Sequence, residues 1–436
     1  MIATARVAAF DALREIEARH LDLGEAVARV RKPLADERDR ALLLELVSGT
    51  LRMRAAIDYQ LSSRLSRPLS KLDEAVRIIL RMSGFQLLYL SRIPASAVIN
   101  DAVELTRRAG KSSATGLVNA VLRALARDRD KLAWPAVPPP GAAVDAVAEY
   151  LAVVQSHPAW LVSRWVERHG RDATERWLAF NNHAPALCLA PNRTLVSREA
   201  LAEELRADGV ETEPTTRAPH GLLVVSGQPL ATRAFREGRF LVQDEASQLI
   251  AALVDPARGA RVLDLCASPG GKTLSLVADV GGQGLVVASD VRPHRLRLLA
   301  TTLARCRATR ARVIHVPAEG PLPLREQSFD TVLIDAPCSG LGTVRRDPDI
   351  RWRRSPEDLP RFASSQLNLL DRACGLVRAG GTLIYSTCSS EPDENEDVVS
   401  AFLLTHPNYA QERTHQTLPF RDGLEAFYGA VLRRAL

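Results

Sequence analysis

Short apolar runs alternate with helical segments from about residue 245 to the end of the chain, and this alternation constrains the fold most strongly. The runs have the length and composition of buried strands, and they span 261–265, 284–290, 312–316, 330–335 and 382–387. Segments of helical periodicity separate most of them, over 273–280, 293–306, 357–379 and 395–405. Apolar strands that alternate with helices are typical of a parallel sheet covered on both faces. The predicted fold of residues 241–436 is therefore a Rossmann-like α/β domain.

The first 133 residues show only helical periodicity. Apolar residues recur three or four positions apart, as at Phe10, Leu13 and Ile16, with charged residues between them. No strand-like alternation interrupts this pattern, so we expect an all-α bundle over residues 1–133.

Two serines mark predicted helix starts. Ser70 is followed three residues later by Asp73, which is the spacing of an N-cap and an acid in the first turn. Ser355 is followed by Pro356 and then Asp358, which predicts that Ser355 caps the last long helix of the chain.

The region between these two parts is mixed. The proline-rich segment 134–143 predicts a stiff linker, because proline cannot continue a helix. Helices are predicted over 157–170, 174–182 and 198–209, the last ending at Gly209, and strands over 185–192, 221–227 and 238–247. Residues 144–240 are therefore expected to form a small α+β domain of the RRM or ferredoxin-like kind.

The positive charge of the chain is concentrated in its helical part. The net charge is +6, whereas residues 1–135 alone hold 23 basic and 16 acidic residues, a net charge of +7. Basic residues gathered on one domain fit contacts with nucleic-acid phosphates. They fit equally well an arginine-rich surface exposed to solvent.

The remaining composition argues against several classes of protein. No apolar run approaches the ~20 residues that span a bilayer, and the start of the chain lacks the apolar core of a signal peptide. The six cysteines include no CxxC pair, so we expect reduced thiols and a cytoplasmic protein. The nine histidines are dispersed, and we expect no metal site.

A glycine-rich loop follows the first predicted strand of the α/β domain, in the sequence DLCASPGGKT from Asp264 to Thr273. The second strand ends in Asp290, where a carboxylate accepts hydrogen bonds from the two hydroxyls of a ribose. A nicotinamide dinucleotide would need GxGxxG, and a P-loop would need a glycine where Cys266 stands, so S-adenosylmethionine fits the loop best. A glycine turn that binds no ligand is the remaining alternative.

Cys338 and Cys388 each follow directly on a predicted strand of one sheet, and each is followed by serine. Carboxyl ends of parallel strands are where ligands bind, so both cysteines are candidates for reactive thiols as well as for small buried side chains. Cys188, Cys306 and Cys374 are expected to be buried and unreactive.

Three longer segments resemble motifs of the RNA 5-methylcytosine methyltransferases, and in particular the RsmB (Sun/Fmu) family. They are VLDLCASPGGKT at 262–273, FDTVLIDAPCSGLGTVRRDPDIRW at 329–352 and LIYSTCSSEPDENE at 383–396. Upstream, RIPASAVINDAVELTRR and GLVNAVLRALAR resemble the NusB-like helical domain of that family. The resemblance implies an enzyme that uses S-adenosylmethionine to methylate carbon-5 of a cytosine in 16S ribosomal RNA, the family's target being cytosine 967.

The resemblance also implies partners and alternatives. The substrate would be small-subunit ribosomal RNA, naked or in early assembly, bound by a monomer in the cytoplasm without metal or membrane. The same chemistry on another ribosomal or transfer RNA cytosine is one alternative. A non-catalytic RNA-binding assembly factor is the other.

Residue roles follow from the same resemblance. The cofactor loop of the family corresponds to Cys266, Ala267, Ser268, Pro269, Gly270, Gly271 and Lys272. Asp290 would bind the ribose, while Asp335 and Lys272 would contact the cytosine or the cofactor. Cys388 would be the nucleophile and Cys338 would assist product release. DNA cytosine methyltransferases attack with the cysteine of a Pro-Cys pair, here Cys338, so only the resemblance to the RNA enzymes favours Cys388.

Two residues depart from the family pattern, and a basic loop is a further candidate for RNA contact. Ser268 stands where many members have alanine, and Pro317 stands where members usually have an acid, with Glu319 two residues on. Glu319 would replace that acid, or the adenine pocket would consist of backbone and apolar walls. The basic loop holding Arg345, Arg346 and Arg351 is predicted to contact RNA phosphates or to be simply solvated. Trp352 is expected to anchor this loop, with stacking on a base as the alternative.

Overall fold

The computed structural model describes residues 2–436, which form two compact units. The helical unit comprises Met1–Ala184 and Val344–Pro356. The second unit comprises Pro185–Thr343 and Glu357–Leu436, and it is called the catalytic unit after the activity that the resemblance implies. The segment 344–356, which the sequence joins to the Cys338 motif, therefore packs with the helices rather than with the sheet. No helix within residues 2–436 is both long and apolar enough to cross a membrane.

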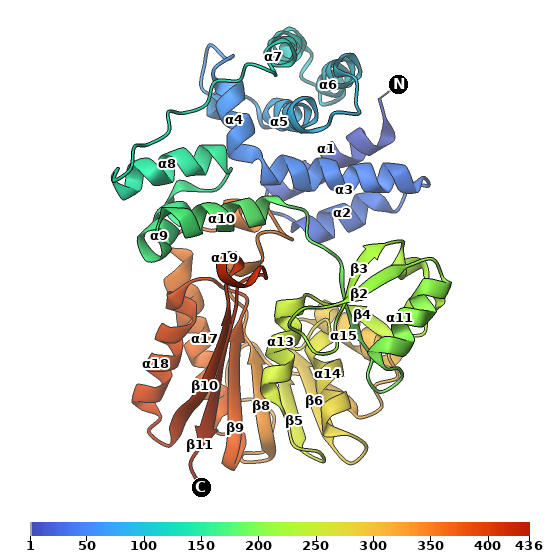
Figure 1. Ribbon diagram of the computed structural model, residues 1–436, viewed down its shortest axis with the longest axis vertical. Helices are drawn as coiled ribbons and strands as arrows, with labels where there is room; N and C mark the ends of the chain where they lie inside the picture. Colours follow the sequence, from blue (N-terminus) through green and yellow to red (C-terminus); the bar gives the residue numbers. More distant parts are fainter. Residues whose placement is uncertain (1) are drawn as a thin grey trace. The chain divides into compact units, whose positions relative to one another are not determined.

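The helical unit confirms the predicted all-α region (Figure 1). Its helices are α1 (Thr4–Glu17), α2 (Leu23–Arg31), α3 (Glu37–Arg52), α4 (Arg54–Ser62), α5 (Glu74–Tyr89), α6 (Ala95–Arg108), α7 (Thr115–Arg127), α8 (Val144–Val154), α9 (Ala159–His169), α10 (Arg171–Asn182) and α16 (Ile350–Arg353). Phe10, Leu13 and Ile16 lie on the buried face of α1, as their spacing predicts.

Both predicted helix starts are wrong in detail. Ser70 lies in a separate 3-10 turn, and Asp73 itself caps α5 by accepting a hydrogen bond from the Ala75 amide. The extended, buried Leu72 separates the turn from the helix, which the spacing of polar residues does not reveal. The last long helix, α17 (Asp358–Cys374), begins three residues after Ser355, which belongs to the helical unit instead.

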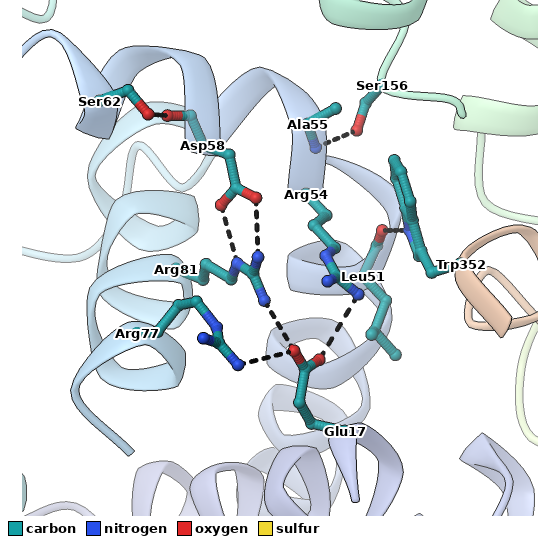
Figure 2. A network of polar contacts seen from close by, with 10 residues as sticks. All are labelled: Glu17, Leu51, Arg54, Ala55, Asp58, Ser62, Arg77, Arg81, Ser156 and Trp352. Atoms are coloured by element: carbon teal, nitrogen blue, oxygen red, sulfur yellow. Dashed lines mark hydrogen bonds and ion pairs between the residues drawn. The ribbon is translucent and has the colours of Figure 1, made fainter. Parts of the chain in front are cut away.

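Three arginines and two acids form a polar network inside the helical unit (Figure 2). Arg81 donates to both oxygens of Asp58, at 2.7 and 2.8 Å, and to Glu17 at 3.2 Å. Arg77 and Arg54 also lie within 3.3 and 3.4 Å of the Glu17 carboxylate. Because these basic side chains are paired internally, only part of the positive charge of residues 1–135 faces solvent.

The catalytic unit begins with a four-stranded antiparallel sheet in the order β2-β3-β1-β4. The strands are β1 (Cys188–Pro191), β2 (Glu211–Pro214), β3 (Leu222–Ser226) and β4 (Phe240–Val242). In the chain, α11 (Arg198–Ala207) lies between β1 and β2, and the short α12 (Arg233–Arg236) lies between β3 and β4. Gly209 follows α11 with φ +76°, so it is the predicted helix stop. The predicted strand over 238–247 is too long, since α13 (Glu245–Val254) begins within it.

The second sheet has seven strands in the order β10-β11-β9-β8-β5-β6-β7. The strands β5 (Arg261–Leu265), β6 (Leu285–Asp290), β7 (Ala311–His315), β8 (Phe329–Asp335) and β9 (Val377–Thr387) confirm the five predicted ones and are parallel. The pair β10 (Tyr409–Thr417) and β11 (Phe427–Arg434) is antiparallel and extends the sheet. The helix predicted over 357–379 ends at Cys374, because Val377 already pairs with Phe329 in the sheet.

Helices cover both faces of this sheet (Figure 1). Val262, Leu333 and Ile384 point to one face and pack against α13 and α14 (Gly271–Val280). Their neighbours Leu263 and Leu383 point to the other face and pack against α17 and α18 (Glu396–Thr405). The remaining helices of the catalytic unit are α15 (Pro293–Arg305) and the short α19 (Pro419–Asp422). Burial on both faces explains why the strands are continuously apolar.

Candidate active site

The glycine-rich loop connects the end of β5 to the start of α14. Gly270 precedes the helix with φ +107°, a conformation that favours glycine, and a Cβ there would meet Leu299 at 3.1 Å. A Cβ at Gly271 would meet the Gln243 side chain at 3.1 Å. The loop thus depends on its glycines to reach the start of α14, and the N-terminus of a helix is where backbone donors bind ligands.

Asp290 ends β6 beside this loop. One carboxylate oxygen accepts a hydrogen bond from the Arg292 amide at 3.0 Å, and the other lies 3.6 Å from Nε of Arg295. Arg295 also donates to the Ser268 carbonyl at 2.9 Å, and the Ser268 hydroxyl donates back to the Arg295 carbonyl. Arg295 thus links Asp290 to the glycine-rich loop, a connection that no sequence motif indicates.

Asp264 and Cys266 lie deeper in the same edge of the sheet. Burial raises the pKa of Asp264 to about 7. The hydrogen bond that Thr273 donates to Asp264 at 2.6 Å lowers this pKa, but by less than burial raises it. Burial, with the nearby Asp335 and Asp290 carboxylates, raises the pKa of the Cys266 thiol to about 12. Cys266 is therefore a protonated thiol at neutral pH.

Lys272 and Asp335 form an ion pair between α14 and the end of β8. The Lys272 ammonium donates to Asp335 at 2.7 Å, and the Ser386 hydroxyl donates to the other Asp335 oxygen at 3.1 Å. Burial disfavours the charged form of Lys272, but the Asp335 carboxylate outweighs burial and raises the Lys272 pKa. A buried cation is thus available at neutral pH, and the Cys388 sulfur also contributes to this stabilisation.

The two cysteines meet in space. Their sulfur atoms lie 3.3 Å apart, within hydrogen-bonding distance, although the residues are fifty positions apart in the chain. Both side chains are partly exposed, while the serine after each is buried. The hydrogen bond to Cys388, together with burial, raises the pKa of Cys338 well above its usual value. Cys338 is therefore protonated at neutral pH and suited to donate to a thiolate on Cys388.

The other predicted residues are placed as follows. Arg351 is fully buried in the helical unit, where it donates to the carbonyl of Ser156 at 3.1 Å and to the side chain of Asn182 at 3.1 Å. A phosphate contact by Arg351 is therefore wrong, because burial removes its guanidinium from solvent. Trp352 donates to the Leu51 carbonyl at 2.6 Å, which confirms anchoring (Figure 2). Arg345, half-buried, donates to the Ala184 carbonyl at 3.0 Å.

The region after β7 contains no buried acid. Glu319 is exposed, and the turn that holds it is fastened by Arg372, whose guanidinium donates to the carbonyls of Pro317, Ala318 and Gly320. Of the three cysteines expected to be unreactive, Cys188 and Cys306 are buried and Cys374 is half-buried. The described residues, 2–436, hold no group of three or more metal-binding side chains.

These residues fit S-adenosylmethionine. Gly270 and Gly271 have no side chains, so a ligand can approach the backbone at the start of α14 closely. Within residues 2–436, the only polar contact of one Asp290 oxygen is with Arg295, at 3.6 Å. In addition, one oxygen of the fully buried Asp264 and the hydroxyl of Ser289 have no partner. Unpaired buried polar atoms at the carboxyl edge are what a bound polar ligand satisfies.

Comparison with protein families assigns all three regions of the chain. Residues 251–432 match the family described as 16S rRNA methyltransferase RsmB/F. Residues 3–127 match the NusB family, and residues 157–231 match the ferredoxin-like domain of RsmF/B-like methyltransferases. The predicted fold classes of all three regions are thereby confirmed.

Curated relatives and a solved structure agree with this assignment. A probable ribosomal RNA small subunit methyltransferase B from Bacillus subtilis (strain 168) is 36% identical, over 86% of this chain and 82% of that protein. The ribosomal RNA small subunit methyltransferase B of Salmonella typhi is 32% identical, over 96% and 98% respectively. The crystal structure of PH0851 has the same fold, with a TM-score of 0.82 at 24% identity over 100% of this chain and 99% of that one. The chain thus belongs to the RsmB/F family of S-adenosylmethionine-dependent ribosomal RNA methyltransferases.

Proposed function

We propose that this protein methylates carbon-5 of a cytosine in small-subunit ribosomal RNA, through a covalent bond between Cys388 and the base. The observation that carries the proposal is the contact between the Cys338 and Cys388 sulfurs, 3.3 Å apart. These thiols lie at the carboxyl edge of the sheet that also carries the Lys272–Asp335 pair.

The chemistry requires a thiolate because carbon-5 of cytosine is a poor nucleophile. Addition of the Cys388 thiolate to carbon-6 forms a carbon–sulfur bond and pushes electron density onto carbon-5. S-adenosylmethionine, held by residues 266–272 and Asp290, supplies an electrophilic methyl group. A base at the site then takes the carbon-5 proton, the electrons of that bond restore the ring double bond, and the carbon–sulfur bond breaks to return the thiolate.

The surroundings of the two thiols support this division of roles. Lys272 is charged and interacts electrostatically with Cys388, and reactive cysteines commonly lie beside such a basic residue. Cys338 keeps its proton and donates a hydrogen bond, which stabilises the Cys388 sulfur as it leaves carbon-6. Asp335, which lies between Lys272 and Ser386, can accept a hydrogen bond from the exocyclic amino group of the cytosine. The Lys272 ammonium beside it can stabilise the negative charge that moves toward nitrogen-3.

The proposal is tested by bisulfite sequencing of ribosomal RNA from cells with and without the gene. We expect one 5-methylcytosine of 16S ribosomal RNA, at the position that corresponds to cytosine 967, to disappear in the deletion strain. If the lost 5-methylcytosine lies at a different ribosomal or transfer RNA cytosine, the proposed reaction is supported and the proposed target is wrong. No missing 5-methylcytosine in any RNA would contradict the proposed activity.

A further inference from the structure

A buried glutamate links the two loops that carry the cysteines. Glu394 is completely buried, and its carboxylate accepts four hydrogen bonds. One oxygen accepts from the Ser339 amide at 2.8 Å and from Nε2 of Gln366 at 2.9 Å. The other accepts from the hydroxyls of Ser339 and Ser389. Two donors on each oxygen use the full capacity of an ionised carboxylate.

The donors are the immediate neighbours of the thiols. Ser339 follows Cys338, and Ser389 follows Cys388, so a single carboxylate fastens both loops. Gln366 adds a second connection, because the same amide nitrogen donates to the Pro337 carbonyl at 3.1 Å. Cys338 is therefore fixed from both sides, through Pro337 and through Ser339.

Glu394 is itself held in place by its neighbours. The Tyr385 hydroxyl donates to the Glu394 carbonyl, and the Asn395 side chain donates to the Ser389 carbonyl at 3.1 Å. The Thr387 hydroxyl in turn donates to Asn395. Among the described residues, Oε1 of Gln366 has no hydrogen-bond partner, but both oxygens of the Glu394 carboxylate are paired. The carboxylate is therefore held rigidly, because displacing it would leave buried groups unsatisfied.

We propose that Glu394 is a positioning residue, which holds the thiols of Cys338 and Cys388 in hydrogen-bonding contact by bridging Ser339 and Ser389. The inference rests on the proposed roles of the two thiols. All partners of the Glu394 carboxylate lie on the two cysteine loops and on α17. A carboxylate that only stabilised the fold would not need this arrangement. A displacement of about 1 Å between reacting groups is enough to lower a rate by about 100-fold.

The carboxylate also has an electrostatic effect on one thiol. The hydrogen bond to Cys388 and burial are the main causes of the raised Cys338 pKa, and the Glu394 charge adds to them. Replacing the carboxylate by an amide removes that contribution, so the pKa of Cys338 should fall and its thiolate should form at lower pH.

The experiment compares three variants of the full-length protein with the wild type. Glu394→Gln keeps the shape and removes the charge. Ser389→Ala keeps the carboxylate and removes its hydrogen bond from Ser389, together with the contacts of that hydroxyl with Ser339 and the Glu391 amide. Asp397→Asn is the matched control, since it makes the same chemical change at an exposed position three residues away. Turnover is measured with a 16S ribosomal RNA transcript and S-adenosylmethionine. Alkylation of each thiol by iodoacetamide is followed against pH by mass spectrometry of the separate cysteine peptides.

We expect Glu394→Gln to lower kcat by at least about tenfold with little change in KM. The midpoint of Cys338 alkylation should move to lower pH, and Asp397→Asn should change neither quantity. Ser389→Ala should give a smaller loss of kcat. A folded Glu394→Gln protein with wild-type kcat and a wild-type alkylation profile would overturn the proposal.

Two further outcomes are also decisive. If Glu394→Gln does not fold, as judged by circular dichroism, Ser389→Ala decides: a lower kcat at unchanged KM supports the proposal, and a wild-type kcat overturns it. If the wild type methylates no RNA, the proposed function fails on its own. The alkylation profiles then still decide whether Glu394 controls the thiol pair.

Discussion

Cys338 and Cys388 have the same side chain, but their neighbours differ. Both loops are fastened to Glu394, but Cys338 keeps its proton, whereas Cys388 interacts electrostatically with Lys272. A protonated thiol is a poor nucleophile, because the thiolate is the reactive form. The two residues should therefore fail in different ways when they are replaced.

Replacement of each cysteine by alanine gives the sharpest test of their roles. Cys388→Ala should be inactive and form no bond to RNA. Cys338→Ala should still form the bond but release product slowly, so a protein–RNA adduct should accumulate and survive a denaturing gel. If Cys388→Ala forms the adduct instead, Cys338 is the nucleophile and Cys388 assists product release.

Asp264 makes folding stability depend on pH. Its folded pKa of about 7 is above the reference value of 3.8, so the folded protein binds this proton more tightly than the unfolded chain does. The stabilisation is fully present below pH 3.8 and is lost as pH rises through about 7, by up to roughly 4 kcal/mol.

The Asp264→Asn variant should lack this loss. We expect urea unfolding of the wild type to show a decrease in the free energy of unfolding between pH 5 and pH 7.5, and a smaller decrease for Asp264→Asn. Equal pH dependence in the two proteins would show that the Asp264 proton is not bound more tightly in the folded state.

The loop between β5 and α14 depends on its backbone conformation. Gly270 has φ +107°, and an added Cβ would also crowd Leu299, so Gly270→Ala should destabilise the protein by about 1–3 kcal/mol. The change should also weaken binding of S-adenosylhomocysteine, measured by calorimetric titration, because the loop must shift. Gly116→Ala on α7 is the control, since nothing lies within 4 Å of the added Cβ. Unchanged affinity in Gly270→Ala would contradict a cofactor role for the loop.

At the level of elements, most strands and helices follow from local patterns, and their ends do not. Five predicted strands of the large sheet are present, because strands buried on both faces must be apolar. The antiparallel β10 is exposed along much of its length and carries no such apolar run, so it escaped prediction. The cap of α5 was assigned to Ser70 instead of Asp73, since both residue types serve as caps.

The chain passes between its two units three times, after residues 184, 343 and 356. The segment 344–356 departs from the catalytic unit just after the Cys338 loop and is fastened in the helical unit by Arg351 and Trp352. A fragment comprising residues 185–436 would carry this segment without the helices that bury it. The fold of the segment therefore depends on residues that precede the catalytic unit in the sequence.

Limited proteolysis tests this dependence. Trypsin should cleave the fragment 185–436 within residues 344–356, which contain five arginines, at least about tenfold faster than it cleaves the full-length protein there. Cleavage is located by mass spectrometry, and sites elsewhere in residues 185–436 serve as internal controls. Equal protection in both proteins would mean that the segment folds without the helices.

The sequence by itself determined the fold classes and the family, because these depend on local periodicity and on contiguous motifs. It also singled out Cys338 and Cys388, whose sulfurs the structure brings within 3.3 Å of each other. Only the tertiary structure decided the surroundings of those residues. Arg351 looks like a phosphate ligand in a basic loop, yet it is buried against residues almost 200 positions earlier. Glu394 looks like one acid among several after Cys388, yet it bridges to Ser339, 55 positions away. Burial and hydrogen-bond partners come from residues distant in the chain, and a linear pattern does not contain them.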